Sequence, residues 1–563
     1  MKRFQLTLLI ATLVVPAFGL AEEPVTRFRR LPVAEYRDKM AAGWLGQMIG
    51  VGWGAPTEFK FNGQIIPEKD VPKWIPERIN QYNQDDIYVE MTFLRSMEQY
   101  GYDVSIRQAG IDFANSGYRL WHANRYGREN LRNGIAPPDS GHPKYNAHAD
   151  DIDYQIEADY SGLIAPGMPN VGIELGEKFG RLMNYGDGLY GGQFVAGMYS
   201  EAFFQDDPKK VVKAGLACIP AESQFAEAIR DVLKWHAAEP DDWKRVWELI
   251  EAKYQDNPAY RRFSCSHGDF NIDAKINAAY IVMGLLYGEK DIEKTTVISM
   301  RCGQDSDCNP SNAAGVLCTM IGENHLPKQY TSALDRTPKF SHTEYNFDAL
   351  LNVCEKLARQ AIVRQGGRIE KQPSGDEVFV IPIATARPSA LENCWEPGPT
   401  IESRYTEAEL QKIEGNVFKK QLNIELGSVF PGWSITNCGE DMAPGLRETF
   451  RGKPQVFVTH PQDRDVPCTL TNTIEVPTGK KTILSTVVSH HAQGDWLLML
   501  KVNAEQTHDR MQINDESCPD GWCTAQFDLS DWAGQTVKLE LLNRATDWRF
   551  EAGYWAEIAI KSE

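Results

Sequence analysis

Residues 303–310 read Gly-Gln-Asp-Ser-Asp-Cys-Asn-Pro, and this stretch decides the interpretation of the fold. Proline is favoured in the first turn of a helix, so a helix is expected to open at Pro310. One aspartate before a helix suffices to cap it, but two aspartates, Asp305 and Asp307, precede this helix. Adjacent carboxylates repel each other unless a cation or a proton lies between them. An Asp-x-Asp pair can direct both carboxylates to one hard divalent cation.

Two more acidic clusters lie far from this stretch in the sequence. Residues 84–86 (Gln-Asp-Asp) stand just before a helix expected over 87–100. Residues 150–153 (Asp-Asp-Ile-Asp) are followed by Glu157 and Asp159. Helix capping and solvent-facing acidity are the structural alternatives to a metal site, and spacing alone leaves both interpretations open.

The apolar pattern is helical from residue 33 to residue 365. It predicts a first helix over 36–49 and a last one over 348–364. Gly43 and Gly46 lie inside the first helix, where each costs about 1 kcal/mol relative to alanine. Such a cost is tolerable where a neighbouring backbone must approach closely. This region is expected to be all-α.

The second part of the chain has a sequence pattern typical of β-strands. The Gly, Pro and charged residues of 366–377 predict a linker. Short β-rich runs separated by turns then predict an all-β, jelly-roll-like sandwich over 378–563. Carbohydrate binding by exposed tryptophans is one role for the sandwich, and the alternative is that these tryptophans form its core. The expected architecture is therefore multidomain, all-α followed by all-β.

The N-terminus predicts export. Lys2 and Arg3 precede an apolar run, and small residues at positions 19 and 21 predict a signal peptide over 1–21. Because no other run approaches the ~20 residues of a membrane span, no stable membrane insertion is expected after cleavage, and the mature protein is expected to be secreted or periplasmic. The net charge of −18 argues against nucleic-acid binding.

Export also permits disulfides. Eleven cysteines is an odd number, so at least one does not pair within the chain. Cys518 and Cys523 bracket the turn sequence Pro-Asp-Gly and are the best candidates for a local bridge.

Three motifs, in order, resemble the ADP-ribosylglycohydrolase family, which includes the dinitrogenase reductase-activating glycohydrolases. Residues 42–50 (Ala-Gly-Trp-Leu-Gly-Gln-Met-Ile-Gly) lead to 54–59 (Gly-Ala-Pro-Thr-Glu-Phe). The family's Thr-Asp-Asp-Thr motif corresponds to 84–87 (Gln-Asp-Asp-Ile). Its Gly-Gly-Asp-Thr-Asp-Thr motif corresponds to 303–308, which an Ala/Gly-rich segment at 313–315 follows. The likeness covers roughly residues 33–365.

The resemblance implies an all-α bundle with a two-metal centre, usually of magnesium. It places the family's metal ligands at Asp85, Asp86, Asp305 and Asp307. Glu58 matches a family position near the metals and the scissile bond.

The chain departs from the family pattern in two ways. Gln84 and Cys308 replace the motif threonines. The amide oxygen of Gln84 can still coordinate, but a thiol is a poor ligand for a hard cation, so we expect one or two ions, with Ca²⁺ or Mn²⁺ as alternatives to Mg²⁺. The family's central Gly-Asn-Gly-Ala-Met-Arg-like stretch is replaced by residues 148–160, which predicts a changed pocket and a different substrate. The candidate substrate-binding residues are His148, Asp151, Asp153, Tyr154 and Asn309, although Asn309 most simply caps the helix at Pro310.

These observations predict a secreted, metal-dependent glycoside hydrolase that cleaves the C1 bond of a glycan or glycoside. Cleavage needs help for the leaving group and an activated water or carboxylate, for which Glu58, Glu157 and Asp159 are the candidates. Two alternatives stay open. The first is an ADP-ribosyl or nucleoside-type N-glycosidase, and the second is a non-catalytic carbohydrate-binding protein on the same scaffold.

Overall fold

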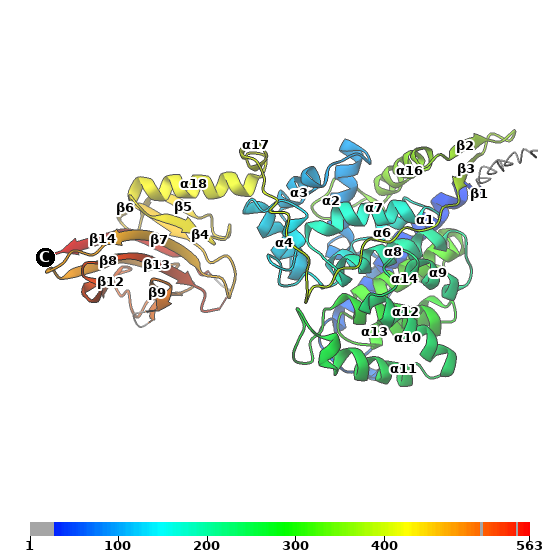
Figure 1. The fold of residues 1–563 in the computed structure, drawn as a ribbon, viewed down its shortest axis with the longest axis horizontal. Helices are drawn as coiled ribbons and strands as arrows, with labels where there is room; N and C mark the ends of the chain where they lie inside the picture. The colour runs from blue at the N-terminus through cyan, green and yellow to red at the C-terminus, as the bar shows by residue number, and fades with distance from the viewer. Residues whose placement is uncertain (1–26, 507–509, 548–549) are drawn as a thin grey trace, which may run out of the picture. The chain divides into compact units, whose positions relative to one another are not determined.

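The computed structural model describes residues 27–506, 510–547 and 550–563, so the predicted signal peptide lies outside the described residues. The chain forms two compact units (Figure 1). The first comprises the chain up to Val104, His148–Gly180 and Asn184–Gly398, and the second comprises Ser105–Ala147, Arg181–Met183 and Pro399–Glu563.

A glycine face on helix α1 (Val33–Gly54) organises the first unit. This helix packs along α14 (Cys308–Ile321) (Figure 1). Gly46, Gly50 and Gly54 follow one another at one-turn spacing. A Cβ atom at these positions would lie 2.4 Å from the Ala314 oxygen, 2.2 Å from the Pro310 oxygen and 2.0 Å from the Ser306 oxygen, respectively. The expected close backbone approach is confirmed at Gly46, whereas Gly43 faces the side chains of Thr319 and Leu163.

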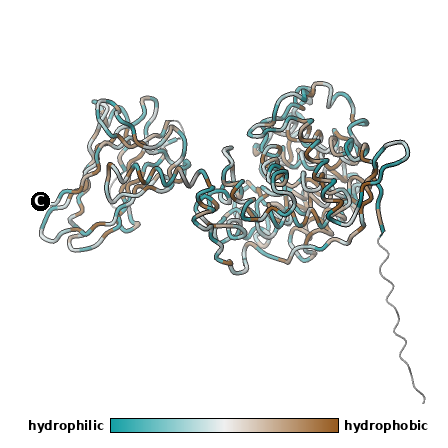
Figure 2. Tube along the Cα trace, turned by 90° about the horizontal axis from the view of Figure 1, so that it is seen from above, coloured by the Kyte–Doolittle hydropathy of each residue, from teal (hydrophilic) through white to brown (hydrophobic). Residues whose placement is uncertain are grey.

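The predicted helices are present with shifted ends. Residues 87–100 belong to α2 (Asp85–Tyr100), and the last helix predicted for the α-region is α16 (Phe347–Arg364). The other helices of the first unit are α5 (Asp153–Ile156), α6 (Asp159–Leu163), α7 (Pro169–Phe179), α8 (Asp187–Ala202), α9 (Pro208–Leu216), α10 (Gln224–Ala238), α11 (Trp243–Ile250), α12 (Ala274–Tyr287), α13 (Ile292–Arg301) and α15 (Lys328–Thr331). Hydrophobic segments gather inside this helical unit (Figure 2).

The predicted linker is in fact a hairpin. Strand β3 (Glu377–Pro382) pairs with β1 (Phe28–Pro32) and β2 (Arg368–Lys371), in the order β1-β3-β2. The Gly, Pro and Ser residues between β2 and β3 form the hairpin turn, where the amide of Gln372 donates to the carbonyl of Asp376 over 2.7 Å. Phe379 and Ile381 are buried in the first unit. The run at 378–381 is therefore not a strand of the sandwich.

The second unit contains the expected antiparallel sandwich. One sheet has the order β10-β9-β13-β7-β4, with β11 also paired to β9, and the other has the order β12-β8-β14-β6-β5. The strands are β4 (Ser434–Thr436), β5 (Gly445–Phe450), β6 (Lys453–Thr459), β7 (Cys468–Glu475), β8 (Thr482–His490), β9 (Trp496–Val502), β10 (Glu505–Gln506), β11 (Met511–Ile513), β12 (Cys523–Asp528), β13 (Thr536–Arg544) and β14 (Gly553–Ser562). Of the candidate tryptophans in the described residues, Trp433 and Trp555 are buried in its core, as the structural alternative predicts, whereas Trp522 and Trp532 are half-buried.

Two helices of this unit, α17 (Glu407–Leu410) and α18 (Glu414–Val429), lie in the region predicted to be all-β. Two others, α3 (Ile106–Ala114) and α4 (His122–Arg132), come from the predicted all-α region 33–365, which therefore does not form a single unit. Leu422 and Leu426 of α18 lie one turn apart and join the core of the sandwich. The predicted disulfide between Cys518 and Cys523 is confirmed. Among the described helices, none combines the length and the apolar character that a transmembrane span requires.

Candidate metal centre and active site

Two helix N-termini bring the acidic motifs together. Asp85 and Asp86 form the first turn of α2, and Asp307 directly precedes α14. One potential ligand atom from each of Asp86, Asp307 and Cys308 lies within 4.8 Å of the other two, and all three residues are buried. Stretches more than two hundred residues apart in the sequence therefore meet in one cluster. We call Asp85, Asp86, Asp305 and Asp307 the acidic cluster.

Cys308 contacts this cluster directly. Its thiol donates to Oδ2 of Asp86 over 3.3 Å, and its backbone amide donates to Oδ1 of Asp305 over 3.3 Å. The other carboxylate oxygen of Asp86, Oδ1, is buried without a hydrogen-bond partner. A buried oxygen of this kind needs a ligand or a proton to offset its lost hydration.

The segment that carries Glu58 is tied to the same loop. The hydroxyls of Thr57 and Ser306 lie 2.8 Å apart, and the amide of Phe59 donates to the carbonyl of Gln304 over 3.1 Å. Glu58 itself stands at the exposed rim of the site. Partial burial, followed by the negative charges of Asp307 and Asp85, raises the pKa of Glu58 to about 8, against the opposing charge of Lys60.

Burial and mutual repulsion raise the pKa values of the carboxylates in the acidic cluster. Burial raises the pKa of Asp305 to about 7, with Glu58 and Asp86 adding to the effect. Burial, followed by Asp307 and Asp85, holds the pKa of Asp86 well above its usual range. Converging carboxylates with a partnerless oxygen are the donor set that a hard divalent cation prefers, so the residues fit such an ion.

Gln84 is the residue before α2. Its carbonyl accepts from the amides of Ile87 and Tyr88, each over 3.1 Å, and its half-buried side chain does not cap the helix. Its role as a ligand stays a prediction.

Glu157 and Asp159 lie beside a third buried carboxylate, Glu90, which the sequence analysis missed. Oε2 of Glu90 accepts from the amide of Tyr160 over 2.8 Å. Burial, then Asp159, and then Glu157 and Asp86 hold the pKa of Glu90 well above its usual range. Glu90 follows Asp86 by one helical turn, so both lie on one face of α2. A charged residue inside an apolar helix face was the available signal.

Asp159 is also linked to α14. Its Oδ2 accepts from the side-chain amide of Asn312 over 2.8 Å, while its Oδ1 is buried without a hydrogen-bond partner. Burial raises the pKa of Asp159 to about 7. Asn312 follows Cys308 by one turn, so α14 presents both residues on the same side.

The other proposed substrate residues lie around a separate buried cluster. Asp151 accepts from the Ser264 hydroxyl and contacts Nδ1 of His148 over 2.6 Å. Burial, then Asp150 and Asp153, hold the pKa of Asp151 well above its usual range. Lys275 pairs with Asp273 in the same region. The sequence analysis missed this lysine.

Two predicted roles need correction. Tyr154 is fully buried, and an added Cβ at Gly192 would lie 2.2 Å from its ring, so it packs as a core side chain. Asn309 does not cap the helix, because α14 begins at Cys308. Its side-chain amide instead donates to Asn277 over 2.8 Å and links α14 to α12.

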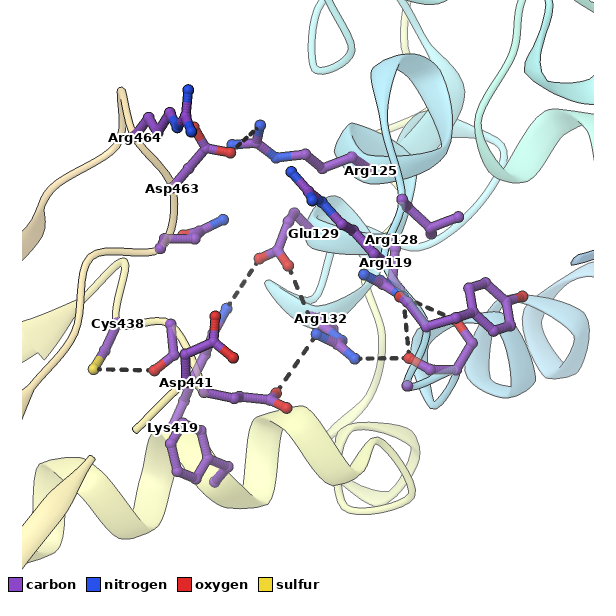
Figure 3. Close-up of a pocket in the computed structure, with 18 of the residues that line it drawn as sticks. Arg119, Arg125, Arg128, Glu129, Arg132, Lys419, Cys438, Asp441, Asp463 and Arg464 are labelled. Atoms are coloured by element: carbon purple, nitrogen blue, oxygen red, sulfur yellow. Dashed lines mark hydrogen bonds and ion pairs between the residues drawn. The ribbon is translucent and has the colours of Figure 1, made fainter. Parts of the chain in front are cut away.

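A cavity of about 650 Å³ lies in the second unit, and its lining includes none of the acidic cluster (Figure 3). Two of the five arginines that line it form ion pairs, Arg125 with Asp463 and Arg132 with both Glu129 and Glu440 at 3.7 and 3.6 Å, and Arg128 donates to the carbonyl of Tyr118 over 2.6 Å. We interpret this cavity as a structural ion-pair network.

Comparison with known protein families identifies one family for the helical region. A sequence model of the ADP-ribosylglycohydrolase family matches residues 32–366. No curated protein matches the chain. A solved ADP-ribosylglycohydrolase-related protein complex is 15% identical, with a TM-score of 0.39, over 58% of this chain and 99% of that chain. The CBM22-1 xylan-binding domain of Paenibacillus barcinonensis Xyn10C is 16% identical, with a TM-score of 0.19, over 24% of this chain and 87% of that chain.

Proposed function

Since the chain belongs to the ADP-ribosylglycohydrolase family, we propose that it hydrolyses a C1 glycosidic bond at the acidic cluster. The observation that carries this proposal is the meeting of Asp86 and Asp307 at the ends of two helices, with ligand atoms within 4.8 Å. The cluster would hold one or two divalent cations, Mg²⁺ first and Ca²⁺ or Mn²⁺ as alternatives. Bound there, such ions supply Lewis-acid stabilisation of oxygen atoms that gain negative charge.

Two carboxyl groups of the protein are the candidates for general acid and general base. Glu58 stands at the rim, and in the cation-free protein partial burial raises the pKa of its carboxyl to about 8; a raised pKa suits a general acid for the leaving group. Asp159 is held by Asn312 and has a pKa of about 7, which suits a general base that accepts a proton from water. Glu157 is the second candidate for that role.

The substrate is proposed to be a glycan or glycoside outside the cytoplasm. The N-terminal sequence supports export, and the replacement of the family's central stretch by residues 148–160 supports a changed pocket. A net charge of −18 disfavours polyanionic partners such as nucleic acid.

An ADP-ribosyl or nucleoside-type N-glycosidase is the second candidate, and the family match itself favours it. A panel of aryl glycosides, oligosaccharides and ADP-ribosylated protein, assayed with and without a chelator, separates the two. We expect hydrolysis of a glycoside that the chelator abolishes and Mg²⁺ or Mn²⁺ restores. Cation binding without turnover of any substrate would instead indicate a non-catalytic binding protein.

A matched pair of variants completes this test. Asp307→Asn removes one charge from the acidic cluster, whereas Asp241→Asn removes one from an exposed position between α10 and α11. The first is expected to lower activity at least 100-fold and the second to leave it at the wild-type level. Equal activity of the two variants would refute the role of the acidic cluster.

A further inference from the structure

A second cavity, in the first unit, begins at the end of α1. It has a volume of about 690 Å³, within the range of ordinary ligand sites. Three of its lining residues are aromatic: Trp53, Trp74 and Tyr330. We call it the aromatic cleft.

The three rings form a compact aromatic group. The centroid of Trp53 lies 5.3 Å from that of Trp74, and the centroid of Tyr330 lies 5.5 Å from that of Trp74. Trp53 and Tyr330 are buried, whereas Trp74 is half-buried. The inner two rings therefore support Trp74, which carries aromatic surface to the cleft.

Hydrogen bonds fix both indoles. Nε1 of Trp53 donates to the carbonyl of Pro72 over 2.6 Å, and Nε1 of Trp74 donates to the carbonyl of Gln329 over 2.8 Å. Because the polar edges of the rings are already satisfied, the surface left for a ligand is apolar. A rigid, pre-oriented aromatic surface loses little conformational entropy when a ligand packs on it.

The rim of the cleft is polar and carries both signs of charge. Its charged residues are Glu68, Lys69, Lys73, Glu293 and Arg301. Arg301 is itself positioned by a 2.9 Å bond from Nε to the carbonyl of Ile66. An aromatic floor with hydrogen-bond donors and acceptors around it matches a sugar ring, which has apolar C–H faces and a ring of hydroxyls.

The cleft adjoins the acidic cluster through the backbone. Trp53 immediately precedes Gly54. A Cβ atom added to Gly54 would lie 2.5 Å from the Cα atom of Asp307. Both sites therefore lie at the C-terminal end of α1, and this shared position is the basis for expecting one chain of sugars to reach both.

We propose that the aromatic cleft binds a further sugar unit of the substrate, so that this protein acts on an oligosaccharide or polysaccharide rather than on a simple glycoside. This inference rests on the proposed glycosidase function and names the substrate class for it.

The test compares Trp74→Ala with Trp74→Phe, which retains a ring, and with Ile75→Ala. Ile75 is exposed on the same loop and does not line the cleft, so Ile75→Ala is the matched control. The probes are xylo-, cello-, manno- and maltotetraose and the corresponding p-nitrophenyl monoglycosides. Binding is followed by isothermal titration calorimetry with the full-length protein, because that signal does not depend on the tryptophan being replaced, and thermal unfolding confirms that each variant is folded.

For Trp74→Ala, we expect kcat/KM to fall at least tenfold more for the preferred tetrasaccharide than for its monoglycoside, through KM. Trp74→Phe should lie between wild type and Trp74→Ala, and Ile75→Ala should match wild type. Equal losses on both substrates, or no loss on either, would overturn the cleft proposal while the glycosidase function stands. Tetrasaccharide binding that Trp74→Ala abolishes, without turnover by wild type, would support the cleft and refute the glycosidase function. Failure of wild type to bind any tetrasaccharide would refute the cleft.

Discussion

Replacing Gly54 with alanine is expected to damage the acidic cluster without touching a carboxylate. The new Cβ would lie 2.0 Å from the Ser306 oxygen and 2.5 Å from the Cα atom of Asp307. Both are backbone atoms, so no side-chain rotation can relieve the clash. Cβ contacts under 3.0 Å essentially do not occur, so the Ser306 oxygen must move by about 1 Å.

Two opposing effects determine the expected change in the free energy of unfolding. Alanine inside a helix is favoured over glycine by about 1 kcal/mol, and overpacking against an immobile neighbour costs about 1–3 kcal/mol. We therefore expect a net loss of about 0–2 kcal/mol in the free energy of unfolding. The effect on cation affinity is expected to be larger in relative terms, since ligand distances tolerate only about 0.2 Å of error. A fall of about 10–100-fold follows for a displaced Asp307.

Urea unfolding and calorimetric titration with Mn²⁺ measure the two effects. Gly427→Ala is the control, because Gly427 lies in α18 with nothing within 4 Å of an added Cβ. That variant should keep or slightly increase stability and leave cation affinity unchanged. Wild-type stability and affinity in Gly54→Ala would refute the argument that close backbone contact positions Asp307.

Two further predictions concern the chemistry of the cluster. Cys308→Thr should raise the affinity for Mg²⁺ by about tenfold, because a hydroxyl is a harder ligand than a thiol. Calorimetric titration with Mg²⁺ measures this affinity. An unchanged affinity would show that the side chain at position 308 does not bind the cation. In a chelator, the contribution of Asp305 to the free energy of unfolding should be complete below its ordinary pKa of 3.8 and be lost as the pH rises through the folded value of about 7. The difference corresponds to about 4 kcal/mol for this one group, and urea unfolding from pH 4 to pH 8.5 measures it; a flat profile would contradict the raised pKa.

The sequence predicted the parts of the site that motifs encode. The motifs at 84–86 and 303–308 predict both the start of a helix and the carboxylates beside it. These carboxylates are Asp85, Asp86, Asp305 and Asp307. Gly46 was interpretable because a glycine inside a helix signals a close neighbour.

Other features depend on tertiary contacts that local patterns do not contain. The turn residues of 366–377 suit a linker and a hairpin equally, and only the pairing of β3 with β1 decides between them. Helix α18 is stabilised by Leu422 and Leu426 against the sandwich core, and its surroundings in the sequence are β-rich. Glu90 gave a weak signal, since its neighbours Glu157 and Asp159 lie far along the chain.

The most direct test of the account is a Mn²⁺ titration of the mature protein followed by electron paramagnetic resonance, with Asp86→Asn alongside. Convergence of Asp86 and Asp307 predicts one or two bound ions in the wild type and a loss of at least tenfold in affinity for at least one of them in the variant. Absence of bound Mn²⁺ in the wild type, or identical binding by the two proteins, would contradict the proposed metal centre.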